Sequence, residues 1–467
     1  MATKKKKSAV EEVEVKEEVQ TSQVAEENEV ALEEAKPENE NLVEAEKVAE
    51  NLEEKADGAD VEEEEEEGET LAWYKRVNLV YLITFIVLAI VLGGAIIYRV
   101  SESGLKYTLN DDRTGYVVSC GRFYDPVVVA IPEEFRGKKV VEVAPEGFQD
   151  CVNLMKLTIP YTVDMIGSNA FFKCTSLKQL ILNDGLKIIG SNAFYGCTSL
   201  AVVNLPNTVK VINAEAFGEC TALYQITIPQ DCTQIGAAAF QYCTFLQKVN
   251  FNNKLVSIGR EAFVGCQNLY GDIVLPSTLT MISERAFASC TNIKSVVIPS
   301  SVTNIGKEAF YDCTNLERAT VNANIDEIPN GLFSNCSKMT SVTIPSTVTQ
   351  IRANAFNNCE KLANFTLPEN LATIDTYAFA FCRALQSISI PTKVNSIDDY
   401  AFRYCTSLTN VVINSAAVPT LGTGVFVKIN NELNNNALEI KVVASLVESY
   451  KVANNWSFYA DRISAIG

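Results

Sequence analysis

The chain contains no histidine among its 467 residues. Histidine is the commonest general acid or base near neutral pH and the commonest ligand of transition metals. Its absence removes the usual partner of a serine or cysteine nucleophile and the usual zinc ligand. No glycine-rich phosphate-binding loop stands out either. We therefore expect the protein not to be an enzyme, and to hold no metal and no cofactor.

Aromatic residues are absent before Trp73, and no hydrophobic period persists there. Residues 1–70 hold 26 Asp and Glu against 8 Lys, including the run Glu62–Glu67. Such a segment cannot bury enough apolar surface to offset the entropy lost on ordering. We predict a disordered acidic tail over residues 1–72, solvated and self-repelling. A role as a partner-binding segment or a spacer is the alternative.

The rest of the chain has no excess of either charge sign. The totals are 57 acidic and 39 basic residues, so removing the tail's 26 and 8 leaves 31 of each. The net charge of −18 therefore belongs to the tail. A neutral balance over the remainder argues against a nucleic-acid partner.

One long hydrophobic run is present, Val77–Tyr98, which has 22 residues and no charge. As a helix it would span about 33 Å, enough to cross the hydrocarbon core of a bilayer. Trp73 and Tyr74 border it on one side, and interfacial aromatics are typical of membrane spans. The run is too long and too far from Met1 for a cleavable signal peptide. We predict a transmembrane helix over residues 77–98, with a buried core helix as the alternative.

The flanking charges do not fix the orientation of this span. Lys75 and Arg76 precede it, while Arg99, Lys106 and Arg113 follow it, which is two against three. No targeting sequence precedes the tail, so we expect the span to act as an uncleaved signal anchor. The protein would then be a single-pass protein of the cell membrane, with a cytoplasmic N-terminal tail and an extracellular C-terminal part.

The remainder repeats one motif twelve times. A cysteine ends each copy, a phenylalanine stands three residues before it, and successive cysteines are 23 residues apart except for one step of 24. A fixed period of this length indicates stacked supersecondary units. The cysteines are Cys151, Cys174, Cys197, Cys220, Cys243, Cys266, Cys290, Cys313, Cys336, Cys359, Cys382 and Cys405.

Each copy begins with a short strand. In the copy that ends at Cys359, Val342 and Ile344 alternate with polar residues, the period of a half-buried strand, and Pro345 then ends the pairing. A turn, an Ile-Gly or similar pair and a short helical or 3₁₀ segment carrying Ala-Phe-x-x-Cys should follow. Stacking would join the strands into a parallel sheet and the phenylalanines into a continuous stack.

The pattern L-x-x-L-x-L-P-x-x-[VL]-x-x-I-x-x-x-A-F-x-x-C covers roughly residues 103–467 and resembles the BspA-type leucine-rich repeat family. The resemblance implies a right-handed leucine-rich repeat solenoid with a parallel β-sheet on its concave face and short helical or 3₁₀ segments on its convex face. It implies an N-terminal cap over 103–135 that opens with a hairpin, an array of about 12 repeats over 136–428, and a C-terminal cap over 429–467. The closing helix of that cap is expected over residues 441–450.

Three places depart from the pattern. Ile131 to Phe148 is 17 residues instead of 12, Gly271 is a one-residue insertion, and no cysteine follows Phe426 at the usual place.

The cysteines are predicted to be free structural thiols. Cysteines of neighbouring repeats would lie about 4.8 Å apart with parallel Cα–Cβ vectors. A disulfide needs converging Cβ atoms about 3.8 Å apart, so these pairs are poorly oriented for one. A linear ladder does not surround a metal ion either. Cys232 occupies a position that holds Val or Leu in other repeats, so we expect it to be a buried core residue.

The outward strand positions are the candidate ligand-binding surface. They are small, mostly uncharged residues without a convergent acid, base or nucleophile. An idle solvated face is the alternative. We expect seven of them to contact a ligand, with the three basic ones giving selectivity: Lys156, Thr158, Lys248, Asn250, Arg318, Thr320 and Thr343.

These features predict a membrane-anchored, cell-surface, non-catalytic module for binding or adhesion to proteins or host and extracellular material. A structural or scaffolding protein with its repeats in the cytoplasm is the alternative. The sequence names neither the ligand nor the oligomeric state.

Overall fold

The computed structural model describes residues 104–121, 124–428, 432–433 and 436–467. The chain divides into two units, Met1–Gly93 and Gly94–Gly467, and the first lies wholly outside the described residues. The predicted acidic tail (1–72) and the predicted transmembrane helix (77–98) also lie outside them, since the described residues begin at residue 104. Among the residues that are described, no helix has the length and apolar character needed to span a bilayer.

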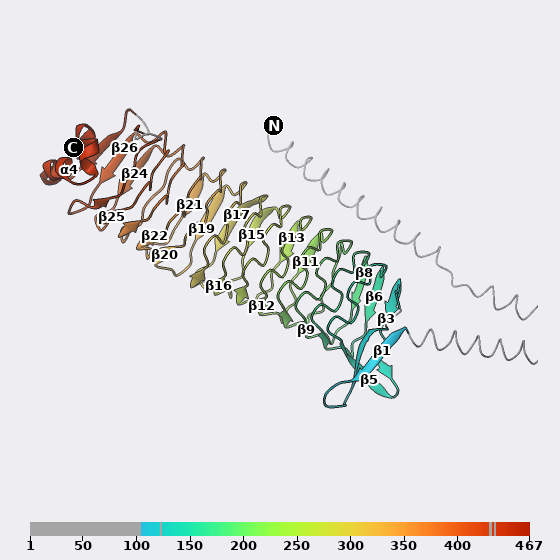
Figure 1. Ribbon diagram of the computed structural model, residues 1–467. Coiled ribbons are helices and arrows are strands. Elements are labelled where there is room, and N and C mark those ends of the chain that lie inside the picture. Colours follow the sequence, from blue (N-terminus) through green and yellow to red (C-terminus); the bar gives the residue numbers. More distant parts are fainter. Residues whose placement is uncertain (1–103, 122–123, 429–431, 434–435) are drawn as a thin grey trace, which may run out of the picture. The chain divides into compact units, whose positions relative to one another are not determined.

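The repeat domain is a parallel β-solenoid, as the period predicts (Figure 1). Each regular repeat contributes one longer strand, in which side chains alternate between core and surface. In β6, for example, Leu157 and Ile159 are buried while Lys156 and Thr158 face outward. We call the surface formed by these strands the long-strand face. Its strands are β3 (Val128–Ala130), β6 (Lys156–Ile159), β8 (Gln179–Leu182), β11 (Gln225–Thr227), β13 (Lys248–Asn250), β15 (Gly271–Val274), β17 (Ile293–Ile298), β19 (Arg318–Val321), β21 (Ser341–Thr343), β24 (Ser387–Ile390), β26 (Asn410–Ile413), β28 (Glu439–Val442) and β29 (Ile463–Ala465).

A second parallel ladder lies along the opposite side of the repeats, at the Ile-Gly or similar pairs that we expected to lie in a connection. Each of its strands has two residues, the second of which is a buried Ile or Leu. We call this side the short-strand face. Its strands are β7 (Met165–Ile166), β9 (Ile188–Ile189), β10 (Val211–Ile212), β12 (Gln234–Ile235), β14 (Ser257–Ile258), β16 (Met281–Ile282), β18 (Asn304–Ile305), β20 (Glu327–Ile328), β22 (Gln350–Ile351), β23 (Thr373–Ile374), β25 (Ser396–Ile397) and β27 (Thr420–Leu421).

The Ala-Phe-x-x-Cys segments form turns, so the prediction of a helical or 3₁₀ piece in each repeat is wrong. Two residues per copy have left-handed backbone conformations, such as Asn169 and Lys173, both at φ 56°. A right-handed helix cannot contain them. Their amides, with that of Phe171 between them, donate hydrogen bonds to the next repeat, and the Phe171 N–H lies 2.8 Å from the Ala193 oxygen. Bonding between repeats therefore replaces bonding within a helix.

The phenylalanine stack is confirmed. From Phe148 to Phe426 the rings follow one another at 5.1–5.9 Å between centroids, with interplanar angles of 2–22°. Every ring in the stack is fully buried. Burying an aromatic ring stabilises by several kcal/mol, and offset stacking adds about 0.5–1.5 kcal/mol per pair. This column is the core of the domain.

The N-terminal cap opens with the expected hairpin, formed by antiparallel β1 (Leu105–Leu109) and β2 (Tyr116–Cys120). The extra residues of the first copy form a second hairpin, β4 (Glu134–Phe135) with β5 (Lys138–Val143). Its two turn residues, Arg136 and Gly137, both have positive φ, as a tight type I′ turn requires. Phe135 stacks on Tyr107 at 3.9 Å, so this hairpin covers the end of the solenoid.

The C-terminal cap contains η2 (Ala444–Leu446), α4 (Val447–Val452) and η3 (Trp456–Arg462). The closing helical segment begins at Ala444 and not at residue 441, because Lys441 and Val442 pair with β26 as part of β28. Tyr459 meets Phe426 edge to face at 5.5 Å. It therefore ends the phenylalanine stack.

Candidate binding face and its clefts

All seven predicted ligand contacts occupy outward positions of the long-strand face. Lys156 and Thr158 lie on β6, Lys248 and Asn250 on β13, Arg318 and Thr320 on β19, and Thr343 on β21. The three basic residues are four and three repeats apart, which corresponds to about 19 and 14 Å at the strand spacing. The structure therefore does not gather them into one cluster.

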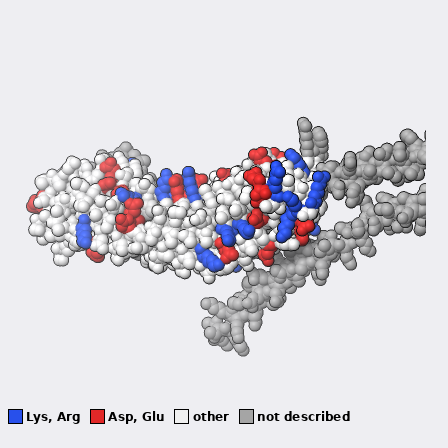
Figure 2. All heavy atoms as spheres, turned by 90° about the horizontal axis from the view of Figure 1, so that it is seen from below, with Lys and Arg blue, Asp and Glu red and all other residues white. Residues whose placement is uncertain are grey.

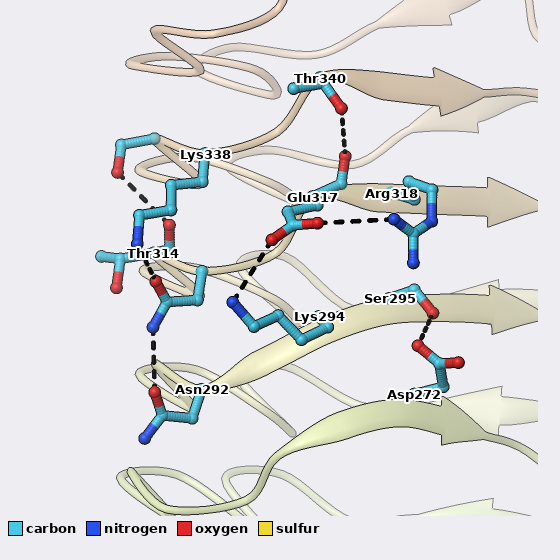
Figure 3. A network of polar contacts seen from close by, with 11 residues as sticks. Asp272, Asn292, Lys294, Ser295, Thr314, Glu317, Arg318, Lys338 and Thr340 are labelled. Carbon is cyan, nitrogen blue, oxygen red and sulfur yellow. Dashed lines mark hydrogen bonds and ion pairs between the residues drawn. The ribbon is translucent and has the colours of Figure 1, made fainter. Parts of the chain in front are cut away.

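Many outward polar side chains are engaged by the next repeat (Figure 3). Glu317 lies 3.3 Å from the Lys294 ammonium and 3.5 Å from the guanidinium of Arg318. Ser295 donates a hydrogen bond to Asp272 in the same manner, one repeat further back. Exposed ion pairs of this kind contribute about 0–1 kcal/mol each. Their consequence here is that Arg318 already has a carboxylate partner.

A cleft interrupts the long-strand face between β13 and β15. Elsewhere β11 pairs with β13, and β15 continues to β17, β19 and β21, but β13 and β15 do not pair. The cleft has a volume of about 510 Å³. It is lined by Gln247, Lys248, Val249, Asn250, Phe251, Leu269, Tyr270, Gly271, Asp272, Ile273 and Val274. This size is within the range of ligand pockets in proteins, about 300–1,000 Å³.

The inserted Gly271 lies at this break. It has φ +82°, and the pairing of β15 with β17 shifts register between Gly271 and Asp272, which pair with Ile293 and Ser295. A β-bulge of this kind disrupts the ladder locally. The ring of Phe251 also takes a strand-end position that most other repeats fill with Ile or Leu, and it packs edge-on against Phe263 at 5.9 Å. The extra residue and the large ring coincide at this opening.

The walls of the cleft are apolar where the sheet would normally cover them. Val249 and Phe251 belong to the core but are only partly buried. On the opposite wall Val274 is 77% exposed and Tyr270 is 59% exposed, and the neighbouring Val297 is 49% exposed. Exposed apolar side chains gathered beside a cleft mark a binding surface more strongly than scattered ones do.

The rim of the cleft carries one positive and one negative side chain. Lys248 and Asp272 are exposed on opposite walls. Lys248 takes part in no ion pair within the described part of the chain. Of the predicted contacts, Lys248 and Asn250 line the cleft, and the other five lie outside it. Tyr270, Val274 and Phe251 were not predicted, although the 24-residue step marks their position in the sequence.

A second opening lies near the C-terminal end of the same face. No strand forms over residues 363–367, between β21 and β24, and a cavity of about 400 Å³ borders Phe365, Thr366 and Ser389. Phe365 packs edge-on against Phe356 and Phe379 at 5.0 and 4.9 Å. The predicted continuous sheet of about a dozen strands is thus interrupted between β13 and β15 and between β21 and β24, where a phenylalanine occupies an inward strand position. It is also interrupted between β8 and β11, where Val202 forms only an isolated bridge with Gln225.

The fourteen cysteines are free thiols. Eleven of the repeat cysteines, from Cys174 to Cys405, donate an S–H hydrogen bond to the phenylalanine carbonyl of the preceding repeat, at 3.1–3.3 Å. The sequence predicted burial for these thiols but not this bond. Burial raises the pKa of each of these thiols. Their role is structural.

Cys120 is different because it is half-buried in the N-terminal cap, 3.9 Å from the sulfur of Cys151. The S–H of Cys151 points at the Cys120 sulfur, and this hydrogen bond lowers the pKa of Cys120. The same contact and burial raise the pKa of Cys151.

Charges on the side seen from below in Figure 1 are mixed. Figure 2 shows Lys and Arg lying beside Asp and Glu in bands, with uncharged surface between them. Lys187 pairs with Asp164 at 3.2 Å, and Arg352 with Glu327 at 2.6 Å. Neighbouring repeats thus neutralise one another's charges. Within the described residues, no three His, Cys, Asp or Glu side chains are placed to hold a metal ion.

Comparison with known proteins agrees with this architecture. The family model described as BspA type leucine rich repeat region matches residues 141–270, 268–352 and 326–444. A leucine-rich repeat protein from Bacteroides ovatus is 28% identical, with a TM-score of 0.58, over 78% of this chain and 98% of its own. A leucine rich cell surface protein from Faecalibacterium prausnitzii is 26% identical over 67% and 94%, with a TM-score of 0.38. The T. pallidum leucine rich repeat protein is 25% identical over 56% and 88%, with a TM-score of 0.22. Comparison with curated proteins gives no match.

Proposed function

The chain belongs to the BspA-type leucine-rich repeat family, and from this premise we propose that it is a membrane-anchored cell-surface protein whose repeats bind other proteins without catalysis. Leucine-rich repeat domains generally mediate protein binding. The observation that carries the proposal is the interrupted long-strand face, where apolar side chains stand exposed around a cleft of about 510 Å³. A solvated face without a ligand does not need that exposure.

The long-strand face is large enough for a protein partner. About a dozen strands at ~4.8 Å extend roughly 55 Å along the array, and a standard interface needs about 800 Å² on each partner. Solenoids commonly bind through such extended surfaces. Most outward side chains are small and polar, and energetic anchors such as Tyr and Trp are few among them. We therefore expect micromolar affinity for one copy, raised when many copies share a membrane.

Membrane anchoring is supported by the sequence of residues 77–98, a 22-residue uncharged run bordered by aromatic residues. Placement of the repeats outside the cell follows if this run acts as a signal anchor. Protease added to intact cells, with any outer barrier made permeable, should then digest the repeats and spare the acidic tail. Loss of tail epitopes with intact repeats would reverse the orientation and favour a scaffolding role inside the cell.

Binding itself is tested by incubating cells that display the full chain with a panel of purified extracellular-matrix and serum proteins. We expect saturable capture of at least one of them. Cells that display the Val274→Lys and Val297→Lys double variant should capture it less, because both side chains lie on the long-strand face. Cells with Ile188→Lys, an exposed position on the short-strand face, are the control. Absence of saturable capture across the panel would count against a binding role.

A further inference from the structure

The cleft between β13 and β15 leaves two strand edges facing each other. Paired strands lie about 4.8 Å apart, but most Cα atoms of β13 and β15 are more than 8 Å from one another. One repeat earlier the Ile228 N–H donates to the Asn250 oxygen at 2.9 Å; within the described residues, no equivalent bond joins Phe251 to Val274. An inserted strand needs two spacings, about 9.6 Å. The two walls are joined at their amino ends, where the Tyr270 N–H donates to the Gln247 oxygen at 3.3 Å. The space for one more strand therefore lies beyond that bond, along β13 and β15.

The chemistry of the opening favours a polypeptide backbone. Two facing strand edges present alternating N–H and C=O groups, and an extended peptide satisfies both rows at the correct repeat. One wall contains Val249 and Phe251, and the opposite wall contains Tyr270 and Val274. Both are apolar, so apolar side chains on the peptide would be accommodated. A sugar or a lipid headgroup has no matching row of donors and acceptors.

We propose that this cleft binds an extended peptide segment of a partner protein, inserted as an additional strand between β13 and β15. This inference rests on the proposed binding function and assigns its site. The strands have three and four residues, so three or four residues of the segment form backbone hydrogen bonds. Lys248 and Asp272 lie on opposite walls, so the segment carries little net charge. The segment is expected to alternate between apolar residues and small polar residues.

Deletion of Gly271 is the most direct test. It restores the 23-residue step, so β13 and β15 should pair and close the cleft. The probe is an array of hexapeptides in which Val, Ile, Leu or Phe alternates with Ser or Thr, bound to the full chain in detergent micelles. We expect a subset to bind the wild type, and at least tenfold weaker binding of the same peptides to the deletion variant. A thermal midpoint that does not fall would show that the variant is folded.

A matched pair of substitutions tests the position of the site. Val274→Lys places a charge on the cleft wall, whereas Val297→Lys makes the same change at the paired position on β17. The first should weaken peptide binding at least tenfold, and the second less than twofold. N-methylation of either of two successive central residues of the peptide should weaken binding, because successive N–H groups point to opposite strands. Sensitivity to only one of the two methyl groups would show binding to a single edge and overturn insertion.

The remaining outcomes separate this inference from the binding function. If no peptide binds the wild type, or if the deletion variant binds equally well, the inserted-strand proposal is wrong. If the wild type dimerises without peptide and the deletion variant does not, the cleft takes a second copy of the chain instead. Capture of proteins by displaying cells is measured in parallel. Capture that persists in the deletion variant would keep the binding function and reject this site.

Discussion

Alkaline pH should unfold this domain through its cysteines. Burial raises the pKa of twelve thiols, the eleven repeat cysteines from Cys174 to Cys405 and Cys232, above the ordinary value of 9.0. In the unfolded chain the same thiols ionise near pH 8.5–9. The folded state therefore holds the protons of these thiols more tightly than the unfolded chain does. The stability they contribute is complete below pH ~8 and is lost as the pH rises towards their folded pKa.

The size of the effect follows from the difference in bound protons. With an unfolded pKa near 9 and a much higher folded pKa, each thiol lowers the free energy of unfolding by about 1.4 kcal/mol between pH 8 and 10. Twelve such thiols would remove about 17 kcal/mol, more than the 5–15 kcal/mol that stabilises a typical domain. Burial also raises the pKa of Tyr450 and Tyr459 to about 12. Tyrosines in the unfolded chain ionise only near pH 10, so this window reports mainly on thiols.

The assay is urea unfolding followed by circular dichroism at pH 8, 9 and 10, without oxygen and with a phosphine reductant. The midpoint should fall steeply with each step, and the chain should be largely unfolded at pH 10 without urea. Cys232→Val is the matched variant, because the equivalent positions of other repeats hold Val or Leu. Its free energy of unfolding should fall by about 1.4 kcal/mol less over the same range. A midpoint that stays constant from pH 8 to 10 would refute the burial of the thiols.

Two further predictions concern the core and the cap. Phe310→Ala should lower the free energy of unfolding by about 3–5 kcal/mol, because the ring lies between Phe287 and Phe333 at 5.3 and 5.9 Å; Phe245→Ala, at an exposed ring, should cost less than about 1 kcal/mol. Equal shifts of the urea midpoint in the two variants would contradict the stack. Iodoacetamide should modify Cys120 before any other thiol of the native chain, since its pKa is lowered and its sulfur is half-buried. Mass spectrometry that finds the repeat cysteines labelled first would contradict the structure.

The terminal phenylalanine changes one expectation drawn from the sequence. A ring at the end of the array should have a stacked neighbour on one side only, so its loss should cost less than that of Phe310. In the structure Phe426 lies between Phe402 and the edge of Tyr459, and it is fully buried. Phe426→Ala should therefore cost nearly as much as Phe310→Ala. The contact with Tyr459 spans 33 residues and leaves no trace in the repeat pattern.

The strands and the phenylalanine stack were predictable because they depend on local alternation and on a constant step. Once Val342 and Ile344 point inward, the same positions 23 residues away must do so too. The second ladder was not predictable in this way, since two residues carry too little period to identify a strand. The left-handed turns were missed because their positions hold not only Asn and Gly but also Glu219, Tyr400 and Phe381. Hydrogen bonds to the next repeat stabilise these turns, and the sequence of a single repeat does not indicate such bonds.

The candidate site was predicted only in outline. Outward positions follow from alternation, which placed Lys248 and Asn250 correctly on the long-strand face. Which outward residues are already paired depends on side-chain positions: Arg318 pairs with Glu317 beside it in the chain, and Lys294 pairs with Glu317 of the next repeat. The cleft lies at a single extra residue, Gly271, and whether β13 and β15 pair there is a property of two repeats together.

The central claim is that the protein captures its partner through the long-strand face. The measurement that tests it most directly is capture of the panel protein by intact cells displaying one of two triple variants. The first changes Lys156, Lys248 and Arg318 to Glu; the second changes Lys187, Lys210 and Lys307, exposed residues next to β9, β10 and β18, to Glu. We predict that the first variant loses capture at equal surface expression and that the second retains it. Capture that survives the first set of changes and fails with the second would contradict the assignment of the binding face.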